Sequence, residues 1–531
     1  MKRIFLADYG IHPGDGNDHA PAIRQAIRDA AACGGQVVFE AGKYYLKEME
    51  DKAAMNLFDM ERVTLTGAVH TDGSPATMIE VDRGLGNDLP IKHVVMIRNS
   101  SHIRLENFIF DFTYRPNSAA RILSADPETD TVVVEVLEGV SHFEGMKCYS
   151  ANAWDLETRE MLHVLPLTIG LDKVKLSNTF HHVPGANERT YAIQNLGFSD
   201  RVKPGDGMSW NFNVVGKEGT CVVVTGEDVQ DLQLENIQVN SSIGPVVVVN
   251  YSKDLSFKKI TIKPQDNYLV VGSRDAFWHC GLRGTYTAED VYIKGVRWDP
   301  FNLRSGFLKV EDISEDRKQI TVEYKEFSRP NPALPGQKLV FWEGKKSTDG
   351  MILGCEEKEQ EKQLILTLQD PVPEELKAGS YVTPGGWLLD QAVFRNVTIE
   401  GNCGTGILFQ NHNLLVENCK FRNNTYDDIC LGPIDAQEGV FVRNAVIRNN
   451  EFDNSTWVNK TAWPGVGALH DGAISVQSAF IPLMDRSYNE NIVIENNVFK
   501  NEAIAICLRN SQNVIIGNNT YENVETTVKQ P

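Results

Sequence analysis

The sequence predicts an all-β chain folded as a right-handed parallel β-helix, a solenoid in which each coil adds short strands to stacked sheets. Three observations predict it: an octad of the form apolar-x-apolar-x-Asn-apolar-x-apolar, a spacing of 22–23 residues between its uninterrupted copies, and the recurrent central Asn. Asn tolerates the left-handed backbone that a sharp bend needs, and such a period indicates a repeat architecture. A β-sandwich predicts neither the period nor the Asn.

The first 46 residues contain the one strong helix pattern that precedes the strands. Apolar residues from Ala22 to Ala30 follow helical spacing, Pro21 falls in the first turn, and Gly34-Gly35 ends the pattern before the strand Val37–Phe39. A single amphipathic helix ahead of many strands is typical of the terminal cap of a repeat protein. We therefore expect an N-terminal capping helix.

The octads follow the cap and set the organisation of the chain. Copies with a central Asn begin at Ile103, Leu232, Ala392, Leu414, Ala445, Ile492 and Val514, and the copies beginning at Leu255 and Val291 carry Lys259 and Gly295 instead. Two stretches lack the octad and alternate like antiparallel strands, which predicts two small inserted β-barrel-like domains. The predicted segments are 1–118 (cap and first coils), 119–221 (insertion), 222–304 (coils), 305–387 (barrel-like insertion) and 388–531 (C-terminal coils).

Composition limits the partners. The formal net charge of −19 disfavours nucleic acid, which needs a basic surface, and no apolar run reaches the ~18 residues of a membrane span. Nine cysteines without a CxxC pair are expected to be small buried hydrophobes, so neither a cofactor nor a metal is expected. The chain is expected to be cytoplasmic, or secreted or periplasmic with its signal peptide removed. Association into a homo-oligomer is compatible with the sequence.

Two aspartates stand out against this repeat. Asp275 and Asp299 begin the related phrases Asp-Ala-Phe-Trp and Asp-Pro-Phe-Asn and are 24 residues apart, about one coil. Coils of a parallel sheet are about 4.8 Å apart, so we expect the two carboxylates side by side. Carboxylates that close raise each other's pKa, and one can stay protonated while the other is ionised. Glycoside hydrolysis needs such an acid and base or nucleophile.

Further residues are predicted to bind a sugar substrate around this pair. Trp278 and Trp298 offer stacking faces, and His279 and Arg283 offer hydrogen bonds to hydroxyl groups. Later coils carry acidic residues that would extend an acidic column along the same face, namely Asp427, Asp428 and Asp471. Solenoid turns are also rich in Asp for backbone reasons alone, so the catalytic interpretation is most specific for Asp275 and Asp299.

The order of these elements resembles glycoside hydrolase family 110, the β-helix exo-α-1,3-galactosidases. The phrase from Arg274 to Gly284, the phrase Trp-Asp-Pro-Phe-Asn ending at Asn302, and the barrel-like insertion after it are similar to the family's ADAFHFSNCRG, Asp-Asp-Ala-Ile-Asn run and inserted barrel. The C-terminal runs GTGILFQN, VIRNNEFDN and NIVIENNVFKN are similar too, and Glu438-Gly439 falls where the family has Glu-Ser-Gly. The resemblance is clearest from residue 222 onward.

This resemblance implies an exo-acting enzyme that removes terminal α-linked galactose from an oligosaccharide or glycoconjugate, with inversion and without a metal. Asp275 matches the first family aspartate and Asp299 the second of the family's doublet, which implies that these two are the catalytic pair. Asn302 and Glu438 are implied to bind substrate. Trp298 stands where the family has the first aspartate of the doublet, a departure that bears on specificity or on the catalytic arrangement.

Two other function classes fit the same fold. A polysaccharide lyase or epimerase would need a basic residue facing a uronic acid, and Lys263, Arg422 and Lys500 follow the octads. A non-catalytic carbohydrate-binding β-helix, such as a surface adhesin, is the other alternative. The pectin-hydrolase branch of the fold is less favoured, because the chain has no Gly-His-Gly motif.

Overall fold

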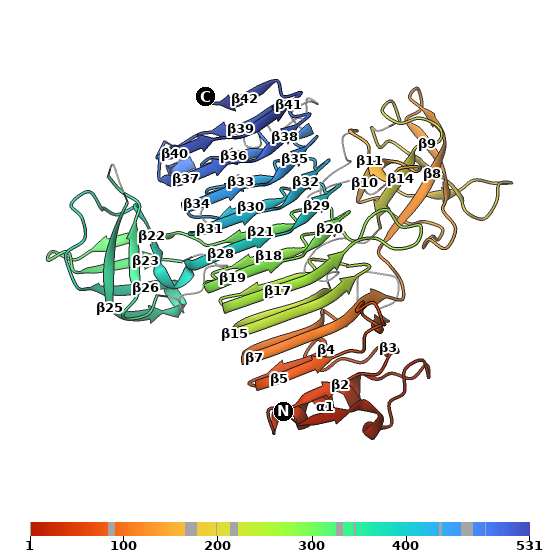
Figure 1. The fold of residues 1–531 in the computed structure, drawn as a ribbon, viewed down its shortest axis with the longest axis horizontal. Helices are drawn as coiled ribbons and strands as arrows, with labels where there is room; N and C mark the ends of the chain where they lie inside the picture. Colours follow the sequence, from red (N-terminus) through yellow and green to blue (C-terminus); the bar gives the residue numbers. More distant parts are fainter. Residues whose placement is uncertain are drawn as a thin grey trace.

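The protein is a parallel β-helix that carries two insertions, as a computed structural model shows (Figure 1). The described residues are 2–82, 91–164, 178–197, 199–212, 221–324, 333–344, 347–434, 438–457, 471–479, 481–483 and 485–530. The predicted fold class is confirmed: parallel strands stack coil on coil, one helix covers the N-terminal end, and two antiparallel units leave the coils. No helix in the described part of the chain is long and apolar enough to span a membrane.

Each complete coil contributes one strand to each of three parallel sheets. The first sheet contains β4 (Ala53–Phe58), the early parts of β7 (His93–Phe112) and β15 (Val222–Val239), β16 (Val247–Asn250), β18 (Phe277–Cys280), β21 (Phe301–Arg304), β30 (Ile407–Gln410), β33 (Ile429–Leu431), β36 (Ile474–Val476), β39 (Ile504–Leu508) and β42 (Thr526–Lys529).

The second and third sheets continue each coil around the corner. The second contains β1 (Arg3–Phe5), β2 (Gln36–Val38), β5 (Glu61–Thr66), the middle of β7 and β15, β17 (Lys253–Ile262), β19 (Arg283–Glu289), β28 (Leu389–Arg395), β31 (Leu414–Glu417), β34 (Arg443–Arg448), β37 (Asn489–Glu495) and β40 (Ser511–Gly517). The third contains β3 (Gly42–Leu46), β6 (Thr77–Val81), the ends of β7, β15 and β17, β20 (Tyr292–Lys294), β29 (Thr398–Glu400), β32 (Lys420–Arg422), β35 (Glu451–Asp453), β38 (Val498–Lys500) and β41 (Thr520–Glu522).

The central residue of every octad makes the bend between the second and third sheets. These residues all have the left-handed backbone that the sequence pattern predicts, with φ between 53° and 73°: Asn107, Asn236, Lys259, Gly295, Asn396, Asn418, Asn449, Asn496 and Asn518. Gly and Asn adopt this conformation most readily. The octad is therefore a corner motif.

A second asparagine column runs just inside this bend. Asn450, Asn497 and Asn519 follow the bend residues, and each Oδ1 accepts a hydrogen bond from a backbone N–H of the preceding coil, at 2.8–3.0 Å. Their Nδ2 groups donate to backbone carbonyls, such as Asn497 to Ile447 at 2.9 Å. Buried backbone groups that the corner would leave unpaired are satisfied in this way.

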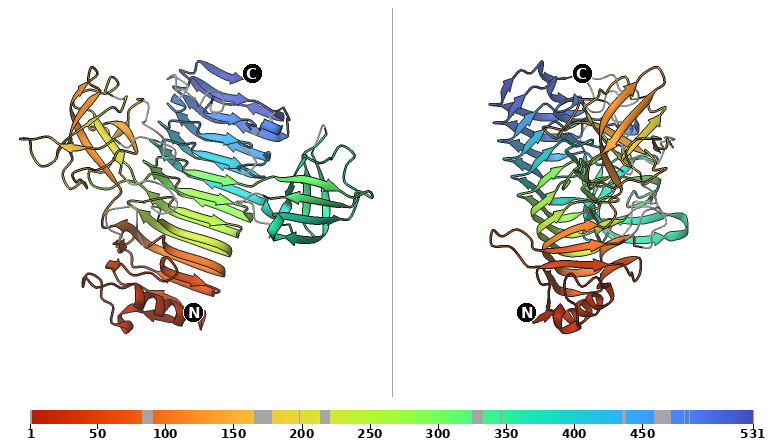
Figure 2. Two further views of the ribbon diagram at one scale, coloured as in Figure 1. Left: turned by 180° about the vertical axis from the view of Figure 1, so that it is seen from behind. Right: turned by 90° about the vertical axis from the view of Figure 1, so that its right-hand side faces the viewer.

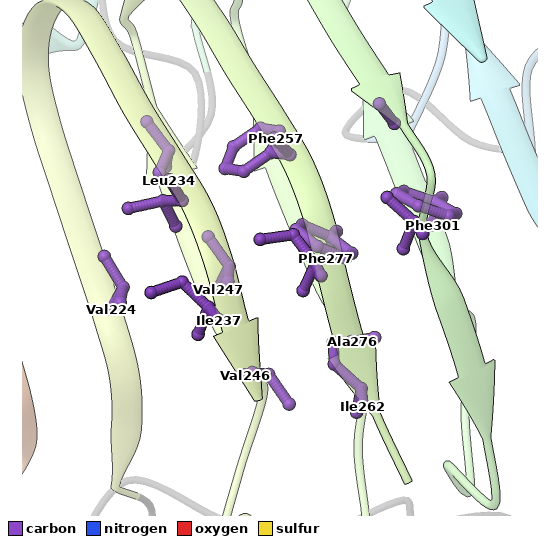
Figure 3. Packing of buried hydrophobic residues seen from close by; sticks show 14 of the residues in the cluster. Val224, Leu234, Ile237, Val246, Val247, Phe257, Ile262, Ala276, Phe277 and Phe301 are labelled. Atoms are coloured by element: carbon purple, nitrogen blue, oxygen red, sulfur yellow. The ribbon is translucent and has the colours of Figure 1, made fainter. Parts of the chain in front are cut away.

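The interior of the coils is apolar and aromatic. Phe277 of β18 lies directly on Phe301 of β21, with ring centroids 4.7 Å apart and planes 8° from parallel. Phe257 meets the edge of Phe277 at 5.1 Å, and all three point inward with neighbouring aliphatic side chains (Figure 3). The stacking of identical positions on successive coils therefore sets the register of β18 and β21.

The N-terminal end is closed by helix α1 (Ala20–Ala31), preceded by the 3-10 helix η1 (Leu6–Tyr9). Its inward face, Ile23, Ala26, Ile27 and Ala30, is fully buried on the first coils. Figure 2 shows the helix across the end of the solenoid. The predicted cap is present, and it covers sheet edges that would otherwise be open to pairing.

The first insertion is a seven-stranded antiparallel sheet in the order β11-β10-β14-β8-β9-β13-β12. Its core continues into loops of the coils through Tyr268, Cys403, Tyr426 and Trp457. The strands are β8 (Asn117–Asp126), β9 (Thr131–Val136), β10 (Ser150–Asp155), β11 (Glu160–Met161), β12 (His181–His182), β13 (Thr190–Gln194) and β14 (Gly207–Asn211).

The second insertion is a closed barrel in the order β22-β23-β26-β25-β24-β27. It contacts the coils through a cluster that includes Phe307, Trp342 and Phe441. In Figure 1 it projects on the opposite side from the first insertion, with β18, β21 and β30 between them. Its elements are β22 (Leu308–Ile313), β23 (Gln319–Glu323), β24 (Lys338–Phe341), β25 (Thr348–Lys358), η2 (Glu359–Glu361), β26 (Gln363–Leu368), β27 (Tyr381–Pro384) and η3 (Gly385–Trp387).

Candidate active site

The two aspartates identified in the sequence occupy one position on adjacent coils. The register pairs Phe277 with Phe301, and the Ala276 N–H donates to the Asp299 carbonyl at 3.1 Å. Asp275 and Asp299 stand in the segments just before β18 and β21, outside the regular strand alternation. Asn302 and Arg304 follow the inward Phe301 at odd spacings and so face outward; Asn302 donates to Asp299, and the Arg304 charge acts on Asp275. Asp275 and Asp299 therefore share this outer face of the first sheet, called the site face below.

The column continues on the next two coils. The pairings of β21 with β30 and of β30 with β33 place Thr405 and then Asp427 after Asp299. The Thr405 N–H donates to Asp299 Oδ1 at 2.8 Å, and the Thr405 hydroxyl donates to Asp427 Oδ1 at 3.0 Å. Gly404 lies directly against Asp299, where a Cβ would come within 2.5 Å of Oδ1. Thr405 and Gly404 on one coil thus hold the Asp299 carboxyl group of the preceding coil in place.

Burial raises the pKa of both aspartates, and the Asp275 charge raises the pKa of Asp299 further. Asp275 is 1% exposed and Asp299 is 5% exposed. Burial raises the pKa of Asp275 to about 6, against the lowering effect of the Arg274 and Arg304 charges. The pKa of Asp299 is raised well above its usual value by burial, by the Asp275 charge, and further by Glu438 and Asp427. The arrangement favours a protonated Asp299 beside a more readily ionised Asp275.

An arginine and a tryptophan flank this pair. The Arg304 guanidinium lies over the Trp278 ring, 4.7 Å from its centroid, and its Nη1 donates to Glu438 Oε1. Trp278 pairs in register with Asn302, whose Nδ2 donates to Asp299 Oδ2 at 3.3 Å. The predicted positions of Trp278, Asn302 and Glu438 are thus brought together beside the aspartates.

Several buried polar atoms on this face have no hydrogen-bond partner among the described residues: Asp275 Oδ1, Asn302 Oδ1, Arg304 Nε, and both side-chain atoms of Gln410. Gln410 is fully buried and pairs in register with Arg304. Unsatisfied buried polar groups are rare in folded proteins. Five of them lie together on the site face, where a hydroxylated ligand would satisfy them.

Trp298 and Asp471 lie at the margins of the site face. Trp298 precedes Asp299 and packs in part against the core of the first insertion. Asp471 lies on a later coil and is already paired, with Arg509 Nη2 and with Lys529 Nζ at 3.2 Å. Asp471 extends the acidic column, and its charge is balanced within the protein.

Two of the predicted substrate-binding residues do not belong to this site. His279 shares the inward face of β18 with Phe277: it is fully buried, its ring stacks on Phe257 at 5.7 Å, and burial lowers its pKa to about 3. Arg283 lies past the turn at Gly281, on the second sheet, where it lines a cavity outside the site face. The predictions for both residues were wrong.

The prediction for Asp428 was wrong as well. Its neighbour Asp427 points outward, so Asp428 points into the corner, where its Oδ1 accepts from Asn424 Nδ2 at 2.8 Å. Burial is the main cause that raises the pKa of Asp428 to about 8. Asp428 is therefore a buried corner group rather than a substrate ligand.

Asp428→Asn is expected to stabilise the protein at high pH. A folded-state pKa of about 8 lies above the unfolded value, so the stabilising protonated form dominates at low pH and is lost as the pH rises through 8. Asn mimics the protonated form, and the gain at pH 9 should exceed about 1 kcal/mol. Urea unfolding of both proteins at pH 5, 7 and 9 measures it. Parallel stability curves across this range would contradict the assignment.

Sequence reasoning missed four residues of the site face: Arg274, Arg304, Thr405 and Gln410. Arg274 Nε lies 3.4 Å from Asp275 Oδ2. The strand alternation after Phe301 and Ile407 carries a signal for Arg304 and Gln410, since both stand three positions beyond an inward residue. Thr405 becomes visible only once the coils on either side of the barrel are aligned.

One protein family and several known proteins are similar to this chain. The family described as "Right handed beta helix region" matches residues 381–528. Alpha-1,3-galactosidase B of Akkermansia muciniphila is 23% identical over 94% of this chain and 63% of its own length, and alpha-1,3-galactosidase A of Shewanella woodyi is 20% identical over 94% of this chain and 82% of its own length. The solved endo-xylogalacturonan hydrolase of Aspergillus tubingensis is 11% identical and covers 98% of this chain and 92% of its own, with a TM-score of 0.41.

The similarity to the two galactosidases extends over nearly the whole chain, while the chain spans 63% of the length of the Akkermansia protein. The chain is a divergent relative of the alpha-1,3-galactosidases, of the glycoside hydrolase family 110 type.

Proposed function

We propose that this protein is an exo-acting glycoside hydrolase that removes a terminal α-linked galactose by inversion, with Asp275 and Asp299 as the catalytic pair. The observation that supports it most is the pair itself: two buried carboxyl groups on adjacent coils, both with raised pKa values, that of Asp299 in part through the Asp275 charge. The choice of galactose rests on the names of the relatives, both called alpha-1,3-galactosidase.

In this mechanism Asp299 is the acid and Asp275 the base. Asp299 has the more strongly raised pKa and gives its proton to the glycosidic oxygen as the bond to the sugar breaks. Asp275, beside the Arg274 and Arg304 charges, is the carboxylate that takes a proton from the attacking water. The water then adds at the opposite face of the sugar ring, which inverts the anomeric carbon.

The contacts of the two side chains support a separation that suits an inverting pair. Adjacent coils are about 4.8 Å apart, whereas inverting carboxyl groups stand about 6.5–9.5 Å apart to admit water. Asp299 is hydrogen-bonded to Thr405, on the coil beyond it, while Asp275 lies against Arg274 of its own coil. The Asp299 carboxyl is thus drawn away from the coil that holds Asp275.

The remaining residues of the site face are suited to hold the sugar ring. Trp278 supplies an aromatic surface, held by the Arg304 guanidinium above it. Asn302 and Gln410 supply buried amides that can bond to hydroxyl groups. A site built to bond hydroxyls rejects analogues that lack them, because its own polar groups are then left unpaired.

The experiment that tests the proposal is digestion of a defined panel of terminal α- and β-galactosides, read by mass spectrometry. We expect release of galactose from α-linked substrates, with α-1,3-linked galactose cleaved fastest. Proton NMR of the reaction should show β-galactose as the first product, as inversion requires. Retained binding without turnover anywhere in the panel would favour a non-catalytic carbohydrate-binding protein instead.

The pH dependence of hydrolysis is expected to be bell-shaped, with an acidic limb near pH 6. Asp275 must be ionised to act as base, so kcat/KM should rise with pH through its pKa of about 6 and fall again when Asp299 loses its proton. Arg274→Gln removes a charge that lowers the pKa of Asp275, which should move the acidic limb to higher pH. An unchanged or downward-shifted acidic limb in this variant would count against Asp275 as the base.

A further inference from the structure

A cavity outside the site face lies where the barrel joins the coils. It has a volume of about 720 Å³ and is lined by residues of β17, β19 and β34 on the solenoid and of β24 and β25 on the barrel. A neighbouring cavity of about 490 Å³ shares Asp390, Asn413 and Asn444 with it. Together they form a trough, called the barrel-side trough below, along the second sheet. None of its lining residues belongs to the site face.

The barrel-side trough is cationic in a strongly acidic protein. Four cations and two carboxylates line the larger cavity, while the chain carries a formal net charge of −19. Asp349 lies 3.1 Å from Arg443 and 3.6 Å from Lys338, so one carboxylate is shared by two of these cations. Arg443 also lies 3.4 Å from Glu490, and Lys253 lies 3.7 Å from Asp254. Among the described residues, Arg283 is therefore the cation of the trough whose positive charge is left for an anionic ligand.

Arg283 is the cation that the protein itself does not neutralise. Among the described residues its guanidinium has no ion-pair partner, and its Nε is buried without a hydrogen bond. A buried guanidinium atom without a partner is costly. Since guanidinium groups match carboxylate and sulfate oxygens in geometry, Arg283 provides a ready contact for such a group.

His412 adds an acceptor to the same cavity. It is 7% exposed, lines the cavity, and its Nε2 has no partner in the described part of the chain. Burial lowers its pKa to about 3, so the ring is neutral, and its other nitrogen bonds to the Phe441 carbonyl. In a neutral imidazole of this kind Nε2 accepts. A ligand hydroxyl is the natural donor to it.

The floor of the barrel-side trough repeats from coil to coil. Asn444 Nδ2 donates to Asn413 Oδ1 at 2.8 Å, and Asn491 Nδ2 donates to Asn444 Oδ1 at 3.2 Å. This ladder follows the solenoid axis through both cavities. Repeated amides along an elongated trough suit an extended, hydroxylated chain better than a single small anion.

We propose that the barrel-side trough is a second saccharide site, separate from the proposed hydrolytic site, that binds an acidic oligosaccharide bearing carboxylate or sulfate groups. Arg283 and Lys253 contact the acidic group, and His412 and the asparagine ladder contact hydroxyl groups. The site does not depend on the proposed hydrolase activity, because it shares no residue with the site face. It would hold an acidic glycan chain on the full-length protein beside the barrel.

The test is calorimetric titration of the full chain with trigalacturonic acid, a sulfated galactotriose and uncharged galactotriose. At least one acidic trisaccharide should bind about tenfold more tightly than the uncharged one, or better. Arg283→Gln and, separately, Lys253→Gln should weaken that binding by about the same factor. The matched control Arg62→Gln removes one charge from an exposed side chain on an N-terminal coil and should leave binding unchanged. Tighter binding of one acid identifies the acidic group.

Two results would overturn the site: binding of galactotriose as tight as that of both acids, or acid binding that neither Arg283→Gln nor Lys253→Gln weakens. Circular dichroism and thermal unfolding verify that each variant is folded, and Lys253 is 42% exposed, so at least that change should be tolerated. Galactoside hydrolysis is measured in the same preparations. If an acidic trisaccharide bound in an Arg283-dependent way but no galactoside was hydrolysed, the proposed function would be refuted and the barrel-side trough would still be a saccharide site.

Discussion

Asp299→Asn is expected to lower kcat for a terminal α-galactoside by about 10³-fold. The amide keeps the shape of the carboxyl group and its bond to the Thr405 N–H, but it has no proton to give to the leaving oxygen. General acid catalysis contributes about 10²–10⁴-fold. Asp275→Asn should cause a loss of similar size through removal of the base. Initial rates of galactose release, with KM determined separately, measure both effects.

The chain offers a matched control on the same coil stack. Asp428→Asn makes the same chemical change at a residue that points into the corner rather than onto the site face, and it should leave kcat within about twofold of the wild type. If Asp299→Asn and Asp275→Asn retained wild-type rates on every substrate that the protein cleaves, the two aspartates would not be the catalytic pair.

Phe301→Ala is expected to destabilise the protein by about 3–5 kcal/mol, the usual cost of emptying a large aromatic site in a core. Phe301 is fully buried, stacks on Phe277 at 4.7 Å and meets Phe394 edge-on at 5.0 Å. It therefore joins the coil before the barrel to the coil after it. Urea unfolding followed by circular dichroism measures the change.

Phe5→Ala is the control for this loss. Phe5 is 39% exposed on the terminal strand β1, and its replacement should destabilise by less than about 1 kcal/mol. Equal effects of the two substitutions would show that the aromatic stack inside the coils carries no special share of the stability. Activity of Phe301→Ala should fall as well, because Asp299 and Asn302 lie on either side of it.

Much of the solenoid was predictable because its corner is a local property. The central Asn of an octad adopts the left-handed backbone through its own side chain, and the spacing of 22–23 residues follows from the stacking of coils. Asp275 and Asp299 were predictable for the same reason, since their spacing is one coil. These features need no knowledge of the tertiary structure beyond the repeat.

The residues that were wrongly assigned to the site are those whose side-chain direction depends on strand alternation or on a turn between two sheets. His279 stands two residues after Phe277, so strand alternation sends both side chains inward, and a polar residue beside aromatics gave a misleading signal. Arg283 lies beyond the positive-φ turn at Gly281, which carries the chain from the first sheet to the second. The pairing of Arg304 with Gln410 was missed because the second insertion, the 83 residues 305–387, separates their coils in sequence.

The hydrogen bond from the Thr405 N–H to Asp299 Oδ1 has a consequence for how this protein folds. It joins residues 106 positions apart and spans the point where the barrel interrupts the solenoid. Repeat arrays can nucleate at several places and grow by adding neighbouring units, and closing a long intervening segment carries an entropic cost. We therefore expect the coils up to Asp299 and the coils from Thr405 onward to form separately and to pack together at the proposed site. During refolding, hydrolytic activity should therefore appear only after these two groups of coils have packed together.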